Sequence, residues 1–97
     1  MKKMALTALL LALPVTAMAD ESCGNFMAAK KTDNEARVLD SYKDGIRDLR
    51  GLEQPAVMKQ FENADLAQKK AWVERAYSKC KRRGAGEDLA NVITDIQ

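Results

Sequence analysis

The sequence predicts an all-α fold, a small bundle of four to five short helices stapled by one disulfide. Three observations lead to this class. Apolar residues after position 19 recur at the three- and four-residue spacing of a helix face, and no segment there shows the alternation typical of a strand. The chain also has only two cysteines, which lie far apart in the sequence and follow a segment with the layout of an export signal, so they are expected to form a disulfide.

Residues 1–19 have the layout of a secretory signal peptide. Lys2 and Lys3 precede an apolar stretch at 4–13, and Ala17-Met18-Ala19 offers a small-residue cleavage site. The apolar stretch is about half as long as the roughly 18–20 residues of a membrane anchor. We therefore expect cleavage after Ala19, a periplasmic location without membrane insertion, and a single all-α domain over residues 20–97.

Removal of the signal also changes the charge balance. The whole chain has 16 Lys and Arg against 14 Asp and Glu, and the signal contains two of the cations and none of the carboxylates. The remaining 14 cations face 14 carboxylates, so composition does not favour a nucleic-acid partner. Because the chain has no His, it lacks an acid–base group for neutral pH and an imidazole ligand, and we expect no enzyme activity, catalytic residue, metal or cofactor.

Cys23 and Cys80 predict one intramolecular disulfide, because the expected compartment is oxidising. The alternative is a pair of free or intermolecularly bonded thiols. A bridge closing a loop this long stabilises the fold by about 4 kcal/mol in the chain-entropy model. That contribution matters in a domain whose core is small.

The first two helices are predicted from capping residues and apolar spacing. Ser22 is placed to cap a short helix that turns Cys23, Phe26 and Met27 to one side. Thr32-Asp33-Asn34-Glu35 has the spacing of a capping box and introduces a second helix, which ends near Arg50 with Gly51 as its C-cap. The inward positions of this helix are Val38, Leu39, Tyr42, Ile46 and Leu49.

Three more helices follow from similar signals. Pro55 suits the first turn of a short helix that ends near Asn63. Asp65 and Gln68 form a second capping box, and the helix they introduce carries Cys80 in its last turn. After Gly84-Ala85-Gly86, acidic residues favour the start of a fifth helix at 87–88. The inward stripes are Val57, Met58, Phe61, then Leu66, Val73, Ala76, Tyr77, Cys80, then Leu89, Val92, Ile93 and Ile96.

Two charged segments are candidate sites. Asp40, Asp44 and Asp48 lie four apart and could form a carboxylate set, but interleaved Lys43 and Arg47 favour a solvated, salt-bridged helix face. The basic run Lys79, Lys81, Arg82 and Arg83 complements the dipole at a helix C-terminus, and it also suits phosphates or anionic lipid. The sequence leaves the role of the basic run open.

The carboxylates predict a response to acid. Their ordinary pKa values lie near 4, so the charge of residues 20–97 rises from zero towards +14 between about pH 5 and pH 2. Carboxylates that are paired in the fold lose their stabilising contribution over the same range.

The segments around the two cysteines resemble a known family. Cys23-Gly24-Asn25-Phe26-Met27 follows the signal, and Cys80-Lys81-Arg82-Arg83 precedes an amphipathic helix that begins near Leu89. This pattern is similar to that of the HdeA/HdeB family of periplasmic acid-stress chaperones. The chain differs by having Gly84-Ala85-Gly86 where family members commonly have Asn-Pro, and by a longer separation between its cysteines.

The resemblance implies a homodimer at neutral pH that dissociates and partly unfolds in acid. The resemblance also implies that the opened chain acts as an ATP-independent holdase for unfolded periplasmic proteins. The disulfide between Cys23 and Cys80 would be the tether in this sequence. We place the candidate dimer or client surface on the apolar stripes around Phe61, Trp72, Val73 and Tyr77.

A second hypothesis is a small periplasmic inhibitor or immunity protein that binds one enzyme or toxin. Its only support is the segment Tyr42-Lys43-Asp44-Gly45-Ile46-Arg47, which resembles the Tyr-x-x-Gly helix of periplasmic immunity proteins.

Overall fold

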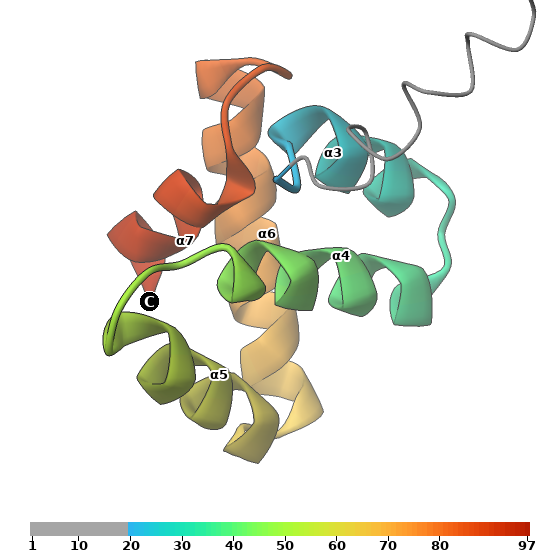
Figure 1. Cartoon of the computed structure of the whole chain (residues 1–97). Coiled ribbons are helices and arrows are strands. Elements are labelled where there is room, and N and C mark those ends of the chain that lie inside the picture. Colours follow the sequence, from blue (N-terminus) through green and yellow to red (C-terminus); the bar gives the residue numbers. More distant parts are fainter. Residues whose placement is uncertain (1–19) are drawn as a thin grey trace, which may run out of the picture.

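The computed structural model describes residues 20–97, which contain five α-helices and no strand (Figure 1). This confirms the all-α class. The predicted signal peptide lies outside the described residues. The helices are α3 (Cys23–Lys31), α4 (Glu35–Arg47), α5 (Glu53–Asn63), α6 (Leu66–Arg83) and α7 (Leu89–Ile96).

Helix α4 lies at the centre of the arrangement and packs against α3, α5, α6 and α7. The longest helix, α6, crosses behind α4, with α3 and α7 towards one end of the bundle and α5 towards the other (Figure 1). One core forms where the five helices meet, because each contributes buried apolar side chains. Its largest fully buried members are Tyr42, Phe26, Phe61, Ile46, Leu89, Ile93 and Val92.

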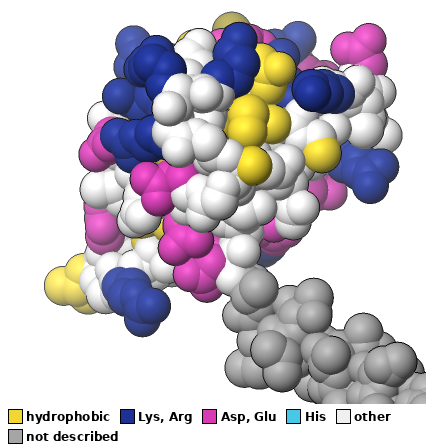
Figure 2. Space-filling view, turned by 90° about the horizontal axis from the view of Figure 1, so that it is seen from above, with side chains coloured by type: hydrophobic (Ala, Val, Ile, Leu, Met, Phe, Trp, Pro, Cys, Tyr) yellow, Lys and Arg dark blue, Asp and Glu magenta, His cyan; other side chains and the backbone are white. Residues whose placement is uncertain are grey.

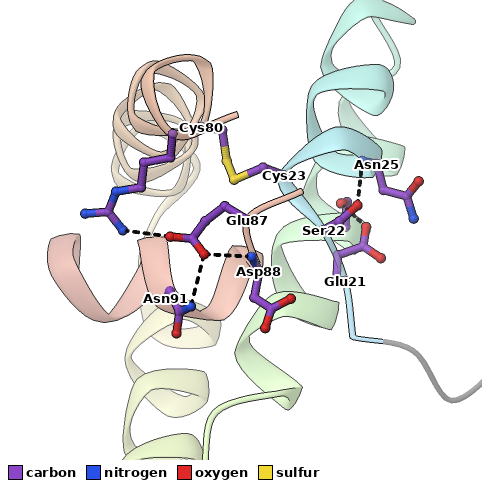
Figure 3. Close-up of a disulfide and its surroundings, with 10 residues drawn as sticks. Glu21, Ser22, Cys23, Asn25, Cys80, Glu87, Asp88 and Asn91 are labelled. Atoms are coloured by element: carbon purple, nitrogen blue, oxygen red, sulfur yellow. Dashed lines mark hydrogen bonds and ion pairs between the residues drawn. A yellow bond between two sulfur atoms is a disulfide. The ribbon is translucent and has the colours of Figure 1, made fainter. Parts of the chain in front are cut away.

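The predicted disulfide is present. It joins Cys23, the first residue of α3, to Cys80 in the last turn of α6, with 5.3 Å between the Cα atoms (Figure 3). Both cysteines are fully buried. The bond therefore fixes the start of α3 against the end of α6.

A short N-terminal strap, residues 21–24, leads into the first turn of α3, includes Cys23 of the disulfide, and pairs with the loop before α7. The amide of Cys23 donates to the carbonyl of Glu87 at 2.8 Å, and the amide of Gly24 donates to that of Ala85 at 3.0 Å. The amide of Leu89 donates in return to the carbonyl of Glu21 at 2.9 Å. The strap thus orders the loop between α6 and α7.

Two of the predicted helix caps are confirmed. The hydroxyl of Ser22 accepts a hydrogen bond from the amide of Asn25 at 3.1 Å, at the start of α3. The carboxylate of Asp65 accepts one from the amide of Gln68 at 2.8 Å, at the start of α6.

The predicted boundaries of α4 were wrong at both ends. Its N-cap is Asn34, whose side chain accepts a hydrogen bond from the amide of Arg37. Thr32 does not cap α4, because its hydroxyl donates to the carbonyl of Ala29 at the end of α3. The helix ends at Arg47 rather than near Arg50. Gly51, with φ of +63°, therefore lies in the following loop and is not its C-cap.

Leu66 was also wrongly assigned to the inward stripe. It is the first residue of α6, before that helix reaches the core, and its side chain is 48% exposed.

Gly45 marks a close approach of α4 to α7. A Cβ atom built on Gly45 would lie 2.7 Å from Cδ2 of Leu89 and 2.9 Å from Cδ1 of Ile93. Both neighbours are fully buried, so they have little room to move. The missing side chain lets the two helices touch.

Substitution Gly45→Ala should lower the free energy of unfolding by about 1–3 kcal/mol through overpacking. This loss should appear although Ala is favoured over Gly in a helix by about 1 kcal/mol. Urea unfolding provides the measurement. Gly86→Ala is the matched control, since no atom lies within 4 Å of a Cβ built there. A Gly45→Ala protein as stable as its parent would contradict the close approach.

Replacement of both cysteines, Cys23→Ser with Cys80→Ser, should lower the free energy of unfolding by about 4 kcal/mol. Urea unfolding of the parent with and without reductant should show the same loss, whereas the double variant should not respond to reductant. Equal unfolding midpoints for the oxidised and reduced parent would show that the bond is dispensable.

Candidate functional site

Four aromatic rings from four helices form a continuous series through the core. Phe26 of α3 lies 6.2 Å from Tyr42 of α4, measured between ring centroids. Tyr42 lies 4.9 Å from Phe61 of α5, and Phe61 lies 6.0 Å from Trp72 of α6. Separation of any two of these helices would therefore expose large apolar rings.

Tyr42 is the one member of this series that carries a titratable group. Its hydroxyl donates to Oε1 of Gln97 at 2.7 Å. Burial raises the pKa of the Tyr42 phenol, so the group stays protonated and remains a donor.

The predicted dimer or client residues occupy two different environments. Phe61, Trp72 and Val73 belong to the core of the folded chain, with exposed fractions of 1%, 8% and 4%. Tyr77 is half-buried at the edge of that core. In the folded chain the first three do not present a surface, so the prediction that they contact partners applies to an opened state.

A hollow of about 290 Å³ lies beside the core, between α3, α4 and α6. Its apolar lining is Val38, Leu39 and Val73, and two ion pairs border it. One pair joins Lys30 to Glu74 at 2.9 Å, and the other joins Lys70 to Glu35 at 3.1 Å. The hollow thus has an apolar floor and a rim of charges that bridge helices.

These two pairs belong to a larger set of ion pairs between helices. The set has four members, and each is at least partly exposed to solvent, so each alone stabilises the fold only weakly. Together they connect all five described helices, and every pair needs an ionised carboxylate. The pairs are Lys30–Glu74 (α3 to α6), Lys70–Glu35 (α6 to α4), Lys43–Glu62 (α4 to α5) and Arg83–Asp95 (α6 to α7).

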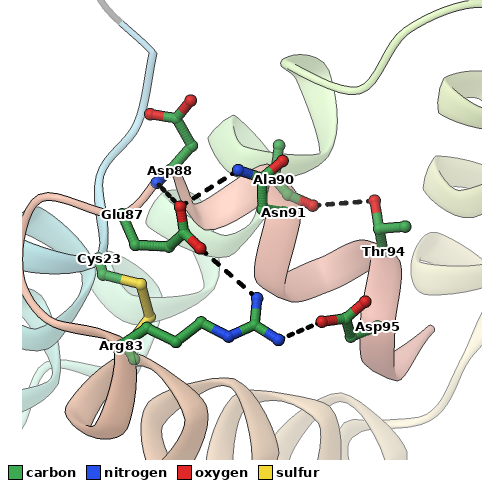
Figure 4. A network of polar contacts seen from close by, with 9 residues as sticks. Cys23, Arg83, Glu87, Asp88, Ala90, Asn91, Thr94 and Asp95 are labelled. Atoms are coloured by element: carbon green, nitrogen blue, oxygen red, sulfur yellow. Dashed lines mark hydrogen bonds and ion pairs between the residues drawn. A yellow bond between two sulfur atoms is a disulfide. The ribbon is translucent and has the colours of Figure 1, made fainter.

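Arg83 lies between two carboxylates at the end of α6 (Figure 4). Its guanidinium contacts Asp95 of α7 and lies 3.6 Å from Glu87 in the preceding loop. The hydrogen bond from Arg83, supported by its charge and by that of Lys79, lowers the pKa of Asp95. The contribution of Asp95 to stability is therefore present above its ordinary pKa and is lost as the pH falls through the lowered value.

The N-terminal strap is also fastened to α4 by carboxylates. The buried hydroxyl of Ser41 donates to the carboxylate of Glu21. The amide of Glu21 in turn donates to Oδ2 of Asp48 at 2.8 Å. The strap is thus held to α4 by two carboxylates and to α6 by the disulfide.

The aspartates on α4 and at its C-cap do not gather into a metal or catalytic site. Asp44 pairs with Arg47 at 2.5 Å, as expected for a salt-bridged face, and Asp48 accepts from the strap. Asp40 is exposed. Within residues 20–97 no group of three or more potential ligands is arranged to hold a metal ion.

Sequence reasoning missed the pairing of charges between helices. The sequence spacing does not indicate that Arg83 pairs with Asp95 or that Lys70 pairs with Glu35. Each of these pairs depends on the way in which two helices cross. Apolar spacing predicts three of the aromatic partners, Phe26, Tyr42 and Phe61, as inward-facing but does not predict that they are neighbours.

No helix in the described part of the chain is both long enough and apolar enough to cross a bilayer. Comparison of the sequence and structure with protein-family models, curated proteins and solved structures finds no match. The resemblance to the HdeA/HdeB family stays a prediction.

Asp95→Asn should destabilise the protein at pH 7, and the difference from the parent should shrink as the pH falls below about 4 and vanish below the lowered pKa of Asp95. Below that lowered value Asp95 of the parent is also neutral, so both proteins lack the ion pair. Urea unfolding at several pH values measures the difference. Asp40→Asn is the matched control, because Asp40 has no ion pair among the described residues. A difference that persists unchanged to pH 3 would rule out the ionic contribution of Asp95.

Proposed function

We propose that this protein is a periplasmic, ATP-independent holdase that opens in acid and binds denatured proteins through its exposed core. The observation that carries the proposal is the set of four ion pairs between helices. Each pair depends on a carboxylate, and together they join the five helices around one aromatic series.

The opening would come from the sum of many small losses. Individual surface pairs are weak, but all lose their carboxylate charge between about pH 5 and pH 2. The 14 cations that remain after signal cleavage would then repel one another without compensation. Since the chain has no His, the response begins well below neutral pH.

The disulfide would limit how far the opened chain expands. It joins residues 57 positions apart and does not depend on protonation. Helix α3 would stay attached to the end of α6 while α5 and α7 move away. The rings of Phe26, Phe61 and Trp72, with Val73 and Tyr77, would then be accessible on one tethered chain.

A homodimer at neutral pH is part of the same proposal, on the family resemblance alone. Size-exclusion chromatography during an acid titration tests it, since a dimer should give way to an expanded monomer below about pH 4.

The holdase activity is tested by light scattering of an acid-labile protein at about pH 2–3, with and without this chain. We expect suppressed aggregation without nucleotide, together with increased binding of a hydrophobic dye. A chain that stays fully folded at this pH, binds no dye and leaves aggregation unchanged would disprove the proposal. A stoichiometric complex with one enzyme or toxin at neutral pH would then favour the inhibitor hypothesis.

A matched pair of variants tests whether the pairs between helices control the opening. Glu35→Gln, Glu62→Gln and Glu74→Gln together mimic protonation of three pairs, so circular dichroism should show opening at a higher pH than in the parent. Asp20→Asn, Asp33→Asn and Asp40→Asn remove the same charge from residues outside those pairs. Equal shifts in both variants would show that net charge alone sets the opening pH.

A further inference from the structure

One face of the molecule combines cations from the last turn of α3 with cations from the last turns of α6. The two helices run antiparallel, because Cys23 at the start of α3 meets Cys80 and Lys30 near its end meets Glu74. In the view onto this face, Lys and Arg side chains gather around a strip of hydrophobic side chains (Figure 2). We call the cations at these helix ends the basic face; they are Lys30, Lys31, Lys79, Lys81, Arg82 and Arg83.

The basic face has more positive charge than its surroundings neutralise. Four carboxylates lie near it: Glu74 pairs with Lys30, the charge of Asp33 also acts on Lys30, and Glu87 and Asp95 pair with Arg83. The two helix C-termini supply only about half a negative charge each. Six cations therefore exceed the compensating charge. Lys31, Lys81 and Arg82 have no ion-pair partner within residues 20–97.

An aromatic ring lies within this face. The ammonium of Lys30 lies 5.1 Å from the ring centroid of Tyr77, and that of Lys81 lies 4.8 Å from the same centroid. Tyr77 is half-buried, as is Met27 one turn before Lys30 on α3. Tyrosine with an apolar body and a polar tip, flanked by lysines, is the composition favoured at the boundary between lipid headgroups and water.

We propose that the basic face binds the surface of an anionic phospholipid bilayer in the folded state at neutral pH. The surplus charge complements lipid phosphates, and contacts of this kind hold a protein at the headgroup layer. The cations are spread over the exposed sides of two helices, which suits an extended charged surface. This role is independent of the holdase activity, because it needs neither acid nor an exposed core.

The test is co-sedimentation at pH 7 with vesicles that contain phosphatidylglycerol, against vesicles of phosphatidylcholine alone. The parent should bind the anionic vesicles at low salt and should be released by about 0.5 M salt, where screening is nearly complete. Lys31→Gln, Lys81→Gln and Arg82→Gln together should weaken binding about a hundredfold, because each cation near such a surface contributes roughly fivefold.

Arg37→Gln, Arg50→Gln and Lys59→Gln form the matched control. These substitutions remove the same charge from exposed cations outside the basic face, and none has an ion-pair partner among the described residues. Binding by the control should fall less than fivefold. Circular dichroism verifies that both variants are folded, and the salt dependence of the parent does not rely on either of them.

Several results would overturn the proposal. These are equal losses in the two triple variants, equal binding to neutral vesicles, and no binding to anionic vesicles at low salt. Capture of the parent by poly-glutamate without binding to vesicles would assign the face to an acidic polypeptide and reject the lipid.

Discussion

The covalent bond between Cys23 and Cys80 holds a weak first helix in place, and several other contacts depend on that placement. Helix α3 has only nine residues and begins with Gly24 and Asn25 after its cysteine, so it has little helical stability of its own. Once α3 is fixed to α6, Phe26 reaches Tyr42 and Lys30 reaches both Glu74 and Tyr77. The strap and the loop before α7 are ordered by the same anchor.

The contacts divide into two groups that differ in their dependence on pH. The disulfide, the aromatic series and the contact of Gly45 with α7 have no proton to lose or gain in acid. The ion pairs between helices need ionised carboxylates. The strap is attached through the carboxylates of Glu21 and Asp48, and hydrogen bonds to a carboxylate are stronger when it is ionised. The two groups are interleaved along the same helices. A protein built in this way can lose its tertiary order in acid while keeping one covalent constraint.

Much of this fold follows from local sequence signals, and the exceptions have physical causes. Helix α6 begins at its predicted cap, Asp65, because the capping hydrogen bond involves only near neighbours. Thr32 misled the prediction because its hydroxyl could serve either of two adjacent helices. The pairing of Arg83 with Asp95 and the position of Tyr77 between two lysines depend on helix crossing, which apolar spacing does not encode. The site was therefore less predictable than the helices.

The pairing of the strap with residues 85–89 also sets the order of folding. Cys23 is synthesised well before its partner, which is 57 positions later. Helix α3 is fixed in place only after Cys80 and residues 85–89 have been made. The packing of Leu89 and Ile93 against Gly45 also has to wait for this later segment. Such long-range closure slows folding relative to a bundle of local hairpins. The N-terminal helices therefore stay loosely structured, and the core is completed only after residues 85–89 have been synthesised.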